Sequence, residues 1–280
     1  MTERFGWIIG AVVAGLALAQ PARAQDMIPG GEEQWKFFAG GILARIDSGI
    51  GLDGTINNGT VIDLNSPNGN KNITNVVLGA QWRPASKHRI SAMYFQSSRT
   101  RTLSIGQTVN IGNDTLVPPT TLDANAKNRF IFATYEYSFV KNENIEFAGL
   151  IGAYLNKFSA DLSGTANVRS GGSTSTVTRA VAYRPSVTVP MPLIGASVDW
   201  FATPALTLGA SLSGLKAKIG DVDGSVYVAT VSAEYMFTRN LGAGLAYMHT
   251  DANVDITKSS FVGTIDWKND NLLLFATLKF

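Results

Sequence analysis

The last ten residues of the chain, 271–280, alternate between two environments and stop on an aromatic residue. Every second residue counted back from Phe280 is apolar: Leu278, Ala276, Leu274 and Leu272. The residues between them include Lys279 and Thr277. A period of two predicts a β-strand whose two faces meet different surroundings. Such a strand needs neighbours with the same pattern, so the stretch predicts a sheet with one strongly apolar face.

This stretch resembles the closing strand of a bacterial outer-membrane β-barrel. The resemblance implies that Phe280 belongs to a terminal signal that the barrel-assembly machinery reads. It also implies that the machinery and the lipids of the outer membrane are partners of the chain. The other strands of the barrel must then come from the rest of the sequence.

The N-terminus has the composition of a secretory signal peptide. Arg4 gives a basic start, residues 7–19 form an apolar run of thirteen, and Ala22-Arg23-Ala24 is an A-x-A cleavage site. Thirteen residues are too few to span about 30 Å of hydrocarbon, which takes roughly 20 in a helix. We therefore expect a cleaved signal over 1–24 and one outer-membrane domain over 25–280.

Composition excludes several classes of protein. No later segment has 18 consecutive apolar residues, so no helix is expected to span a membrane. The chain has no cysteine, which excludes disulfides and thiolate chemistry. Removing Glu3, Arg4 and Arg23 with the signal reduces the 23 basic and 21 acidic residues to 21 and 20. This balance argues against a nucleic-acid partner.

Four short connections, each flanked by aromatic residues, join runs of alternating polarity. The connections are 84–87, 141–144, 203–205 and 238–240. The aromatic set is Trp35, Trp82, Tyr137, Phe139, Trp200, Phe201, Tyr235, Phe237 and Phe280. Aromatic residues favour strands in general, but their clustering at every short turn is typical of the girdle at one membrane interface.

The connections divide the chain into ten predicted strands, an even number that places both termini on the periplasmic side. The strands are 34–44, 72–83, 87–97, 129–139, 144–155, 192–201, 205–216, 225–237, 240–252 and 258–280. Three long outer loops are predicted at 47–71, 98–128 and 156–189, and two short ones at 220–224 and 251–257. The last strand is long enough to suggest a bulge near Asn269. Twelve strands are the alternative, if 101–122 forms an extra hairpin.

Alternation also assigns the faces of the strands. In 225–237, for example, Tyr227 and Val231 face lipid while Ser232 and Glu234 face the lumen. The same rule places eight charged residues inside: Lys36, Arg83, Arg89, Glu136, Glu146, Asp199, Glu234 and Lys279. A basic residue facing lipid at mid-depth would cost about 2–4 kcal/mol, which favours the inward placement. All eight lie near the periplasmic ends of their strands and therefore share one level.

This charged layer has two interpretations. Four positive and four negative side chains in a narrow lumen should pair, because an unpaired buried charge is costly. The layer is then either a salt-bridge network that plugs the barrel or a selectivity constriction in a conducting pore. The balance of signs favours the plug, since a ring of one sign would be expected of a selective pore.

Three further groups of residues are candidates for function. His249 lies at the outer rim, at the height where outer-membrane proteases and lipid A deacylases keep catalytic residues, but no matching acid or serine is evident. His88 adjoins a periplasmic turn and, like His249, is interpreted as a polar residue at the aqueous rim. We expect no enzymatic activity. Residues 221–224 read D-V-D-G and, with Asp251 and Asp255, could hold a hard cation, although Asp-Gly is also a tight-turn signal. The basic residues near the rim could contact lipopolysaccharide phosphates or keep loops soluble: Arg99, Arg101, Arg129, Arg179 and Arg184.

Signal and terminal strand together resemble the OmpA, OmpW and opacity-protein group of small barrels. The resemblance covers the mature chain by pattern and the last strand by motif, and members of the group differ in function. We expect an all-β, transmembrane, antiparallel up-and-down barrel that is monomeric and binds no cofactor or metal. Porin-like passage of small solutes is the expected function. The alternative is a plugged barrel that acts through its long extracellular loops.

Overall fold

The computed structural model describes residues 28–50, 62–63, 73–111, 113–170, 173–184, 186–258 and 261–280. The predicted signal peptide, 1–24, and most of the predicted loop 47–71 lie outside these residues. Within the described ranges, no helix has the length and apolar character needed to cross a membrane.

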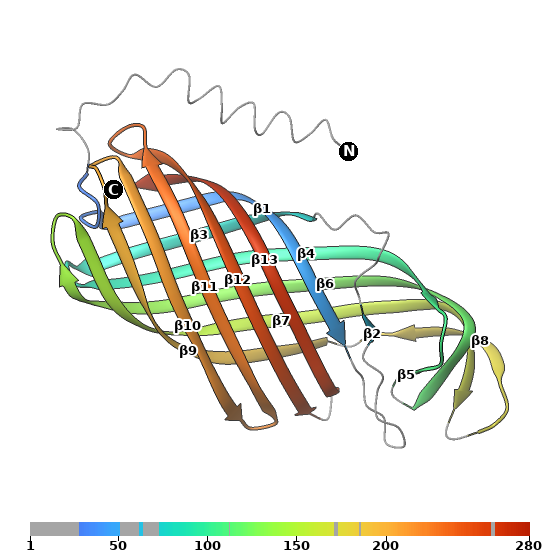
Figure 1. Ribbon diagram of the computed structural model, residues 1–280. Coiled ribbons are helices and arrows are strands. Elements are labelled where there is room, and N and C mark those ends of the chain that lie inside the picture. The colour runs from blue at the N-terminus through green and yellow to red at the C-terminus, as the bar shows by residue number, and fades with distance from the viewer. Residues whose placement is uncertain are drawn as a thin grey trace.

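Ten strands form a closed antiparallel ring (Figure 1). They are β1 (Trp35–Ile50), β3 (Ile73–Ala85), β4 (His88–Ile105), β6 (Asp114–Lys141), β7 (Ile145–Ser170), β9 (Ser186–Phe201), β10 (Leu206–Ile219), β11 (Val222–Met236), β12 (Leu241–Lys258) and β13 (Phe261–Lys279). Each pairs with its neighbours in this order, and β1 pairs with β13 to close the ring. The predicted ten-stranded, all-β barrel is therefore confirmed.

Three short strands flank the ring: β2 (Ile62–Asp63), β5 (Val109–Ile111) and β8 (Val177–Tyr183). They pair with β1, β6 and β7, respectively. The hairpin of β5 and β6 falls in the stretch on which the twelve-strand alternative depended, but it adds no strand to the ring.

The four short turns lie where they were predicted, and small polar side chains stabilise three of them. Oδ1 of Asn142 accepts hydrogen bonds from the backbone N–H groups of Asn144 and Ile145, both at 2.9 Å. The hydroxyls of Thr203 and Thr238 accept equivalent bonds from the residues that follow them. This is the usual way in which Asn and Thr stabilise tight turns. We call this end of the ring the periplasmic end.

At the opposite end the strands are longer than predicted. β4 and β6 stay paired from Ser98↔Lys127 to Ile105↔Thr120, inside the predicted loop 98–128. β7, β8 and β9 occupy most of the predicted loop 156–189, and β12 continues through 251–257. The pairing of β13 with β1 and β12 passes Asn269 without a register shift, so the bulge predicted there is absent.

β12 shows why these stretches are strands. Its outward side chains are apolar up to Tyr247 and polar from His249 onward, whereas inward residues beyond that level, such as Val254 and Ile256, are buried and apolar. The alternation persists but its polarity reverses. The strand therefore leaves the lipid and continues in water around a buried, apolar interior.

Beyond the ring lies a small curved sheet made of β5, β8, residues 114–124 of β6 and residues 160–170 of β7, which we call the surface extension (Figure 1). It has its own apolar cluster: Val109, Ile111, Leu116, Leu122, Ala124, Leu162, Ala166, Val168 and Val181. Asp114 ties its strands together, because its carboxylate accepts hydrogen bonds from Ser170 (2.5 Å), Tyr183 (2.8 Å) and Arg179 (2.6 Å). Burial alone would raise the pKa of Asp114, but these hydrogen bonds and the charge of Arg179 lower it on balance.

An apolar band with aromatic edges surrounds the ring. At the periplasmic edge Trp35 stacks on Trp82 with 5.6 Å between ring centroids. Tyr94, Tyr227 and Tyr247 are exposed at the outer edge. The prediction for Phe201 was wrong, because this residue is buried inside the barrel and does not join the girdle. Exposed apolar side chains between two aromatic rows are typical of a lipid-facing surface.

Candidate functional site

The eight predicted charged residues all point into the lumen near the periplasmic end, as strand alternation predicted. Eight of the ten ring strands, all except β10 and β12, contribute one residue each. They divide into three bonded groups, described in turn below.

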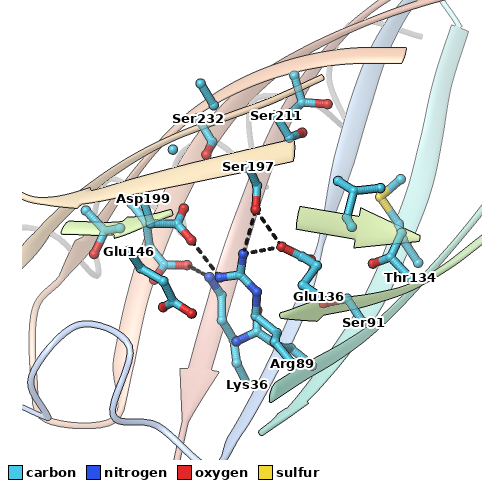
Figure 2. A pocket seen from close by; sticks show the side chains of 18 of the residues that line it. Lys36, Arg89, Ser91, Thr134, Glu136, Glu146, Ser197, Asp199, Ser211 and Ser232 are labelled. Atoms are coloured by element: carbon cyan, nitrogen blue, oxygen red, sulfur yellow. Dashed lines mark hydrogen bonds and ion pairs between the residues drawn. The ribbon is translucent and has the colours of Figure 1, made fainter. Parts of the chain in front are cut away.

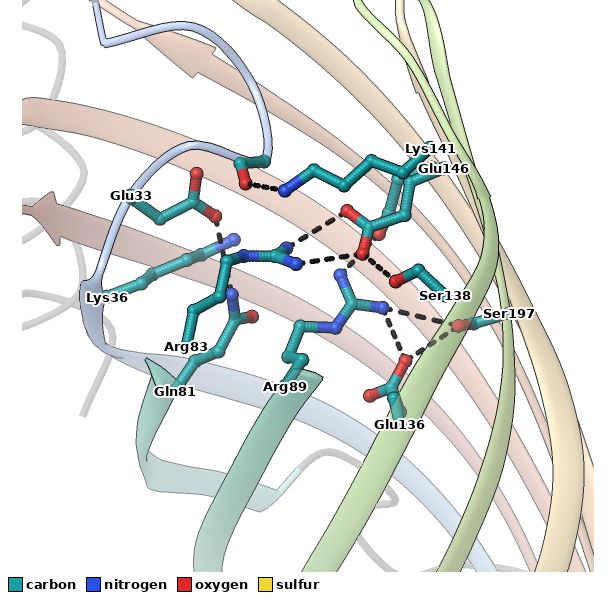
Figure 3. Close-up of polar contacts among 12 residues, drawn as sticks. Glu33, Lys36, Gln81, Arg83, Arg89, Glu136, Ser138, Lys141, Glu146 and Ser197 are labelled. Atoms are coloured by element: carbon teal, nitrogen blue, oxygen red, sulfur yellow. Dashed lines mark hydrogen bonds and ion pairs between the residues drawn. The ribbon is translucent and has the colours of Figure 1, made fainter. Parts of the chain in front are cut away.

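The first group joins Arg83 to Glu146 (Figure 3). Nη1 and Nη2 of Arg83 donate to the two carboxylate oxygens of Glu146 at 2.9 and 3.0 Å. The hydroxyl of Ser138 donates to the same carboxylate. Both charged side chains are buried, and this bidentate geometry is the strongest form of carboxylate pairing.

The second group places two carboxylates around one guanidinium (Figure 2). Arg89 donates to Asp199 at 2.6 Å and forms an ion pair with Glu136. The hydroxyl of Ser197 donates to Glu136 at 2.7 Å and accepts from Arg89 at 3.2 Å. The group carries one excess negative charge.

The third group has the opposite excess. Glu234 on β11 pairs with Lys36 at 2.7 Å and with Lys279 at 2.5 Å. These two lysines lie on the first and last strands of the ring, directly opposite each other in the β1–β13 register. The carboxylate of Glu234 thus bridges the first and the last strand of the ring.

Residues 28–34, which we call the N-terminal turn, add a component that sequence reasoning missed. The turn closes with a hydrogen bond from the N–H of Glu32 to the carbonyl of Pro29 at 3.1 Å. Gly31 has a φ of 78°, and a Cβ atom there would collide with the ring of Phe201. Nζ of Lys141 donates to the Gly31 carbonyl at 2.7 Å, which fixes the turn against the periplasmic mouth (Figure 3).

The N-terminal turn brings a ninth charge, Glu33, into the layer. Its side chain is only 5% exposed, and Oε1 accepts a hydrogen bond from Gln81 at 3.3 Å. Oε2 has no hydrogen-bond partner. Glu33 precedes β1, so the period-two rule that assigned the faces of the strand residues did not assign a face to it.

A cavity of about 280 Å³ lies against the charged layer (Figure 2). One wall, from β9 to β11, carries hydroxyl groups: Ser197, Thr207, Ser211, Ser213, Thr230 and Ser232. The apolar part of its lining includes Phe38, Met93, Phe132, Leu193 and Met248. The cavity is therefore amphipathic, with charges and hydroxyls on one side and apolar side chains on the other.

A layer of apolar side chains fills the lumen on the outer side of the cavity. Phe130 stacks on Phe95 at 4.1 Å and meets the edge of Trp267 at 4.8 Å, while Phe132 packs on Tyr154 at 4.6 Å. We call these five residues the aromatic layer. Nine of the ten ring strands contribute to the cluster around it, through Ile42, Val77, Phe95, Phe130, Tyr154, Met191, Val228, Met248 and Leu273. Phe95, Phe130 and Tyr154 are each 1% exposed, so the lumen is tightly filled at this level, where Asn156, directly opposite Phe130, is buried as well.

The other candidate residues lie outside this constellation. Nδ1 of His249 lies 2.8 Å from Asp270, which also accepts from Tyr247 at 2.6 Å, and the three side chains face outward at the edge of the lipid band. Nδ1 of His88 lies 2.7 Å from the hydroxyl of Tyr135.

The predicted acidic turn forms a different arrangement. Its turn centres on Gly220, with a φ of 59°, and Asp223 lies within β11 opposite Asp255. Among the described residues no three acidic, histidine or cysteine side chains are close enough to share a metal ion. Of the rim arginines, Arg179 pairs with Asp114 and Arg184 with Asp161, while Arg129 faces outward beside Gln96. The side chains of Arg99 and Arg101 are outside the described set.

No family model matches the sequence, and no curated protein matches it. Among solved structures, the outer membrane protease OmpT of Escherichia coli aligns with a TM-score of 0.55 and 9% identity, covering 92% of this chain and 100% of that chain. The P. putida toluene transporter TodX aligns with a TM-score of 0.38 and 8% identity, covering 91% and 93% of the two chains. The attachment invasion locus protein Ail of Yersinia pestis gives a TM-score of 0.34 and 14% identity, covering 89% and 99%. At such identities the likeness to OmpT concerns the fold alone.

The closed ring of ten strands, the apolar band around it and this likeness define the class of the protein. It is a bacterial outer-membrane β-barrel.

Proposed function

We propose that the protein is a closed outer-membrane barrel that acts at the cell surface, with the surface extension as the part that meets partners. The observation that carries this proposal is the buried aromatic layer, whose cluster draws side chains from nine of the ten ring strands. A water-filled pore would leave such side chains exposed. The surface extension supports the second half of the proposal, because it holds its own apolar cluster outside the ring.

Planar-bilayer recording tests this proposal. We expect the refolded native protein to give no steady conductance, with insertion verified independently by protection of the ring from added protease. Steady conductance would contradict a closed lumen.

Porin-like passage of small solutes is the second candidate, and the polar cavity on the periplasmic side favours it. If the native protein conducts, Glu136→Gln should change its ion selectivity. That result would make the charged layer a constriction of a pore.

We also propose that the protein is not an enzyme. His249 contacts Asp270, and this carboxylate can orient the imidazole. Both side chains lie among the polar residues that ring the outer edge of the lipid band, which suits a solvated rim. Hydrolytic chemistry needs a nucleophile or an activated water beside such a pair. The hydroxyl beside Asp270 belongs to Tyr247 and donates to the carboxylate at 2.6 Å.

Lipopolysaccharide phosphate is the partner that we propose for the outer edge of the band. Arg129 on β6 and Lys157 on β7 are directly opposite in the register, and both are exposed on the outward face. Like charges in this position repel each other. Neither forms an ion pair with a described carboxylate, so a phosphate between them would relieve the repulsion.

The double variant Arg129→Ser/Lys157→Ser should bind purified lipopolysaccharide at least about tenfold more weakly, since a hydrogen bond to a charged group contributes about 1.5 kcal/mol or more. Retention of the lipid by immobilised, refolded protein measures the effect. The matched control, Lys87→Ser/Arg239→Ser, removes two exposed cations from the periplasmic end. Equal losses in both variants would refute a local site.

The barrel-assembly machinery remains a proposed partner. In the closed ring, the N–H and carbonyl of Phe280 are already bonded to Trp35 and Gln34. The machinery would therefore have to read this strand before the ring closes.

The protein is also proposed to be monomeric.

A further inference from the structure

The charges around the cavity do not balance. Four cations line it, Lys36, Arg83, Arg89 and Lys279, against five carboxylates, Glu33, Glu136, Glu146, Asp199 and Glu234. Sequence reasoning found equal numbers because it did not include Glu33. Among the lining residues one negative charge is therefore left over, in a partly desolvated space where an uncompensated charge is costly. The side chain of Lys141 is also largely buried at this end, but it does not line the cavity, and its ammonium group is bound to Glu32 and the Gly31 carbonyl.

The excess can be located from the contacts. Glu146 is matched by Arg83, and Glu234 is shared by two lysines. Asp199 has to share Arg89 with Glu136. Glu33 is bonded to a neutral amide through Oε1, while Oε2 is buried without a hydrogen-bond partner.

These two under-neutralised carboxylates belong to one electrostatic neighbourhood. Both interact with the charge of Lys36, and both line the cavity. The side chain of Asp199 is 22% exposed, whereas the carboxylates of Glu146 and Glu234 are 1% and 5% exposed. Asp199 is thus more accessible than these two carboxylates to anything that enters the cavity.

We propose that the cavity binds a small organic ammonium ion that carries hydroxyl groups. The ammonium would neutralise the excess charge at Asp199 and Glu33, and the serine and threonine wall of β9–β11 would bond its hydroxyls. The apolar lining, with Phe38 and Phe132, suits the carbon skeleton and adds aromatic faces that attract a cation. A volume of about 280 Å³ limits the ligand to a small molecule and exceeds what a bare metal ion needs.

The proposal is independent of whether the lumen conducts, because the cavity lies on the periplasmic side of the aromatic layer. The binding site would exist in a closed barrel and in one that conducts.

Calorimetric titration of the refolded, full-length protein at neutral pH and low salt tests the inference. Ethanolamine is the cationic probe, and ethylene glycol is a neutral probe of similar size. We expect saturable binding of one ethanolamine per protein and no binding of ethylene glycol. Glu33→Gln and Asp199→Asn should each weaken ethanolamine binding at least tenfold, because either change balances the charges of the cavity.

The matched control is Glu143→Gln, which removes an exposed carboxylate from a turn at the same end of the barrel and should leave binding unchanged. Glu33 lies outside the ring strands, so Glu33→Gln remains informative if Asp199→Asn fails to fold. Three results would overturn the proposal: no binding of ethanolamine, equal binding of ethylene glycol, or undiminished binding by Glu33→Gln.

Discussion

Replacing Arg83 by methionine should lower the free energy of unfolding by about 3–5 kcal/mol, which is the usual loss when one member of a buried ion pair is removed. The change leaves the carboxylate of Glu146, only 1% exposed, without its bidentate partner. Among the side chains that the structure describes, Ser138 alone would still donate to it. Urea unfolding of the protein refolded in phospholipid vesicles, followed by tryptophan fluorescence, measures the loss.

Two variants separate the buried charge from other effects of the substitution. Arg83→Met/Glu146→Leu removes both charges and should recover most of the lost stability, because no uncompensated carboxylate remains. Arg184→Met breaks an ion pair whose side chains are largely exposed, and it should change the stability by about 0.5 kcal/mol or less. If Arg83→Met resembled Arg184→Met, the charged layer would not be a structural element.

Phe130→Ala should have the second large effect, a loss of about 3–5 kcal/mol together with the appearance of conductance. Phe130 contacts Phe95, Tyr154 and Trp267, so its removal opens a hole where the aromatic layer is centred. The same vesicle unfolding assay gives the stability, and planar-bilayer recording gives the conductance.

Ile131→Ala is the control for Phe130→Ala. It shortens the adjacent side chain on the same strand, but that side chain faces lipid. Its stability loss should be smaller and its conductance should stay at the native level. A Phe130→Ala variant that is silent would show that closure does not depend on the aromatic layer.

Much of the ring could be predicted because successive side chains of a β-strand point to opposite faces. In a membrane barrel one of these faces meets lipid and the other meets the lumen. Lys36, Glu136 and Glu234 could be placed inside by counting along a strand, without knowledge of its neighbours. The short turns could be predicted from Asn142, Thr203 and Thr238, whose side chains act locally.

What failed depended on contacts between distant segments or on a change of solvent. Residues 98–105 and 120–127 were predicted to be polar loops, but they are paired strands. Beyond the lipid the outward face of a strand meets water and carries polar residues, so the apolar outward pattern that identifies a membrane strand is lost there. Phe201 was misplaced because its partners, Gly30 and Gly31, come from a turn far away in the sequence. The aromatic layer unites residues from β4, β6, β7 and β13, and no local pattern connects Phe95 with Trp267.

The sharing of Glu234 bears on the order in which the barrel assembles. When β1 meets β13, Lys36 and Lys279 come directly opposite each other, and two ammonium groups in that position repel. The carboxylate of Glu234, which pairs with both lysines, offsets this repulsion once it lies at the seam. Glu234 reaches it only once β11, β12 and β13 are paired. Closure is thus favoured after the C-terminal hairpins have formed, and an immature sheet is discouraged from sealing on itself.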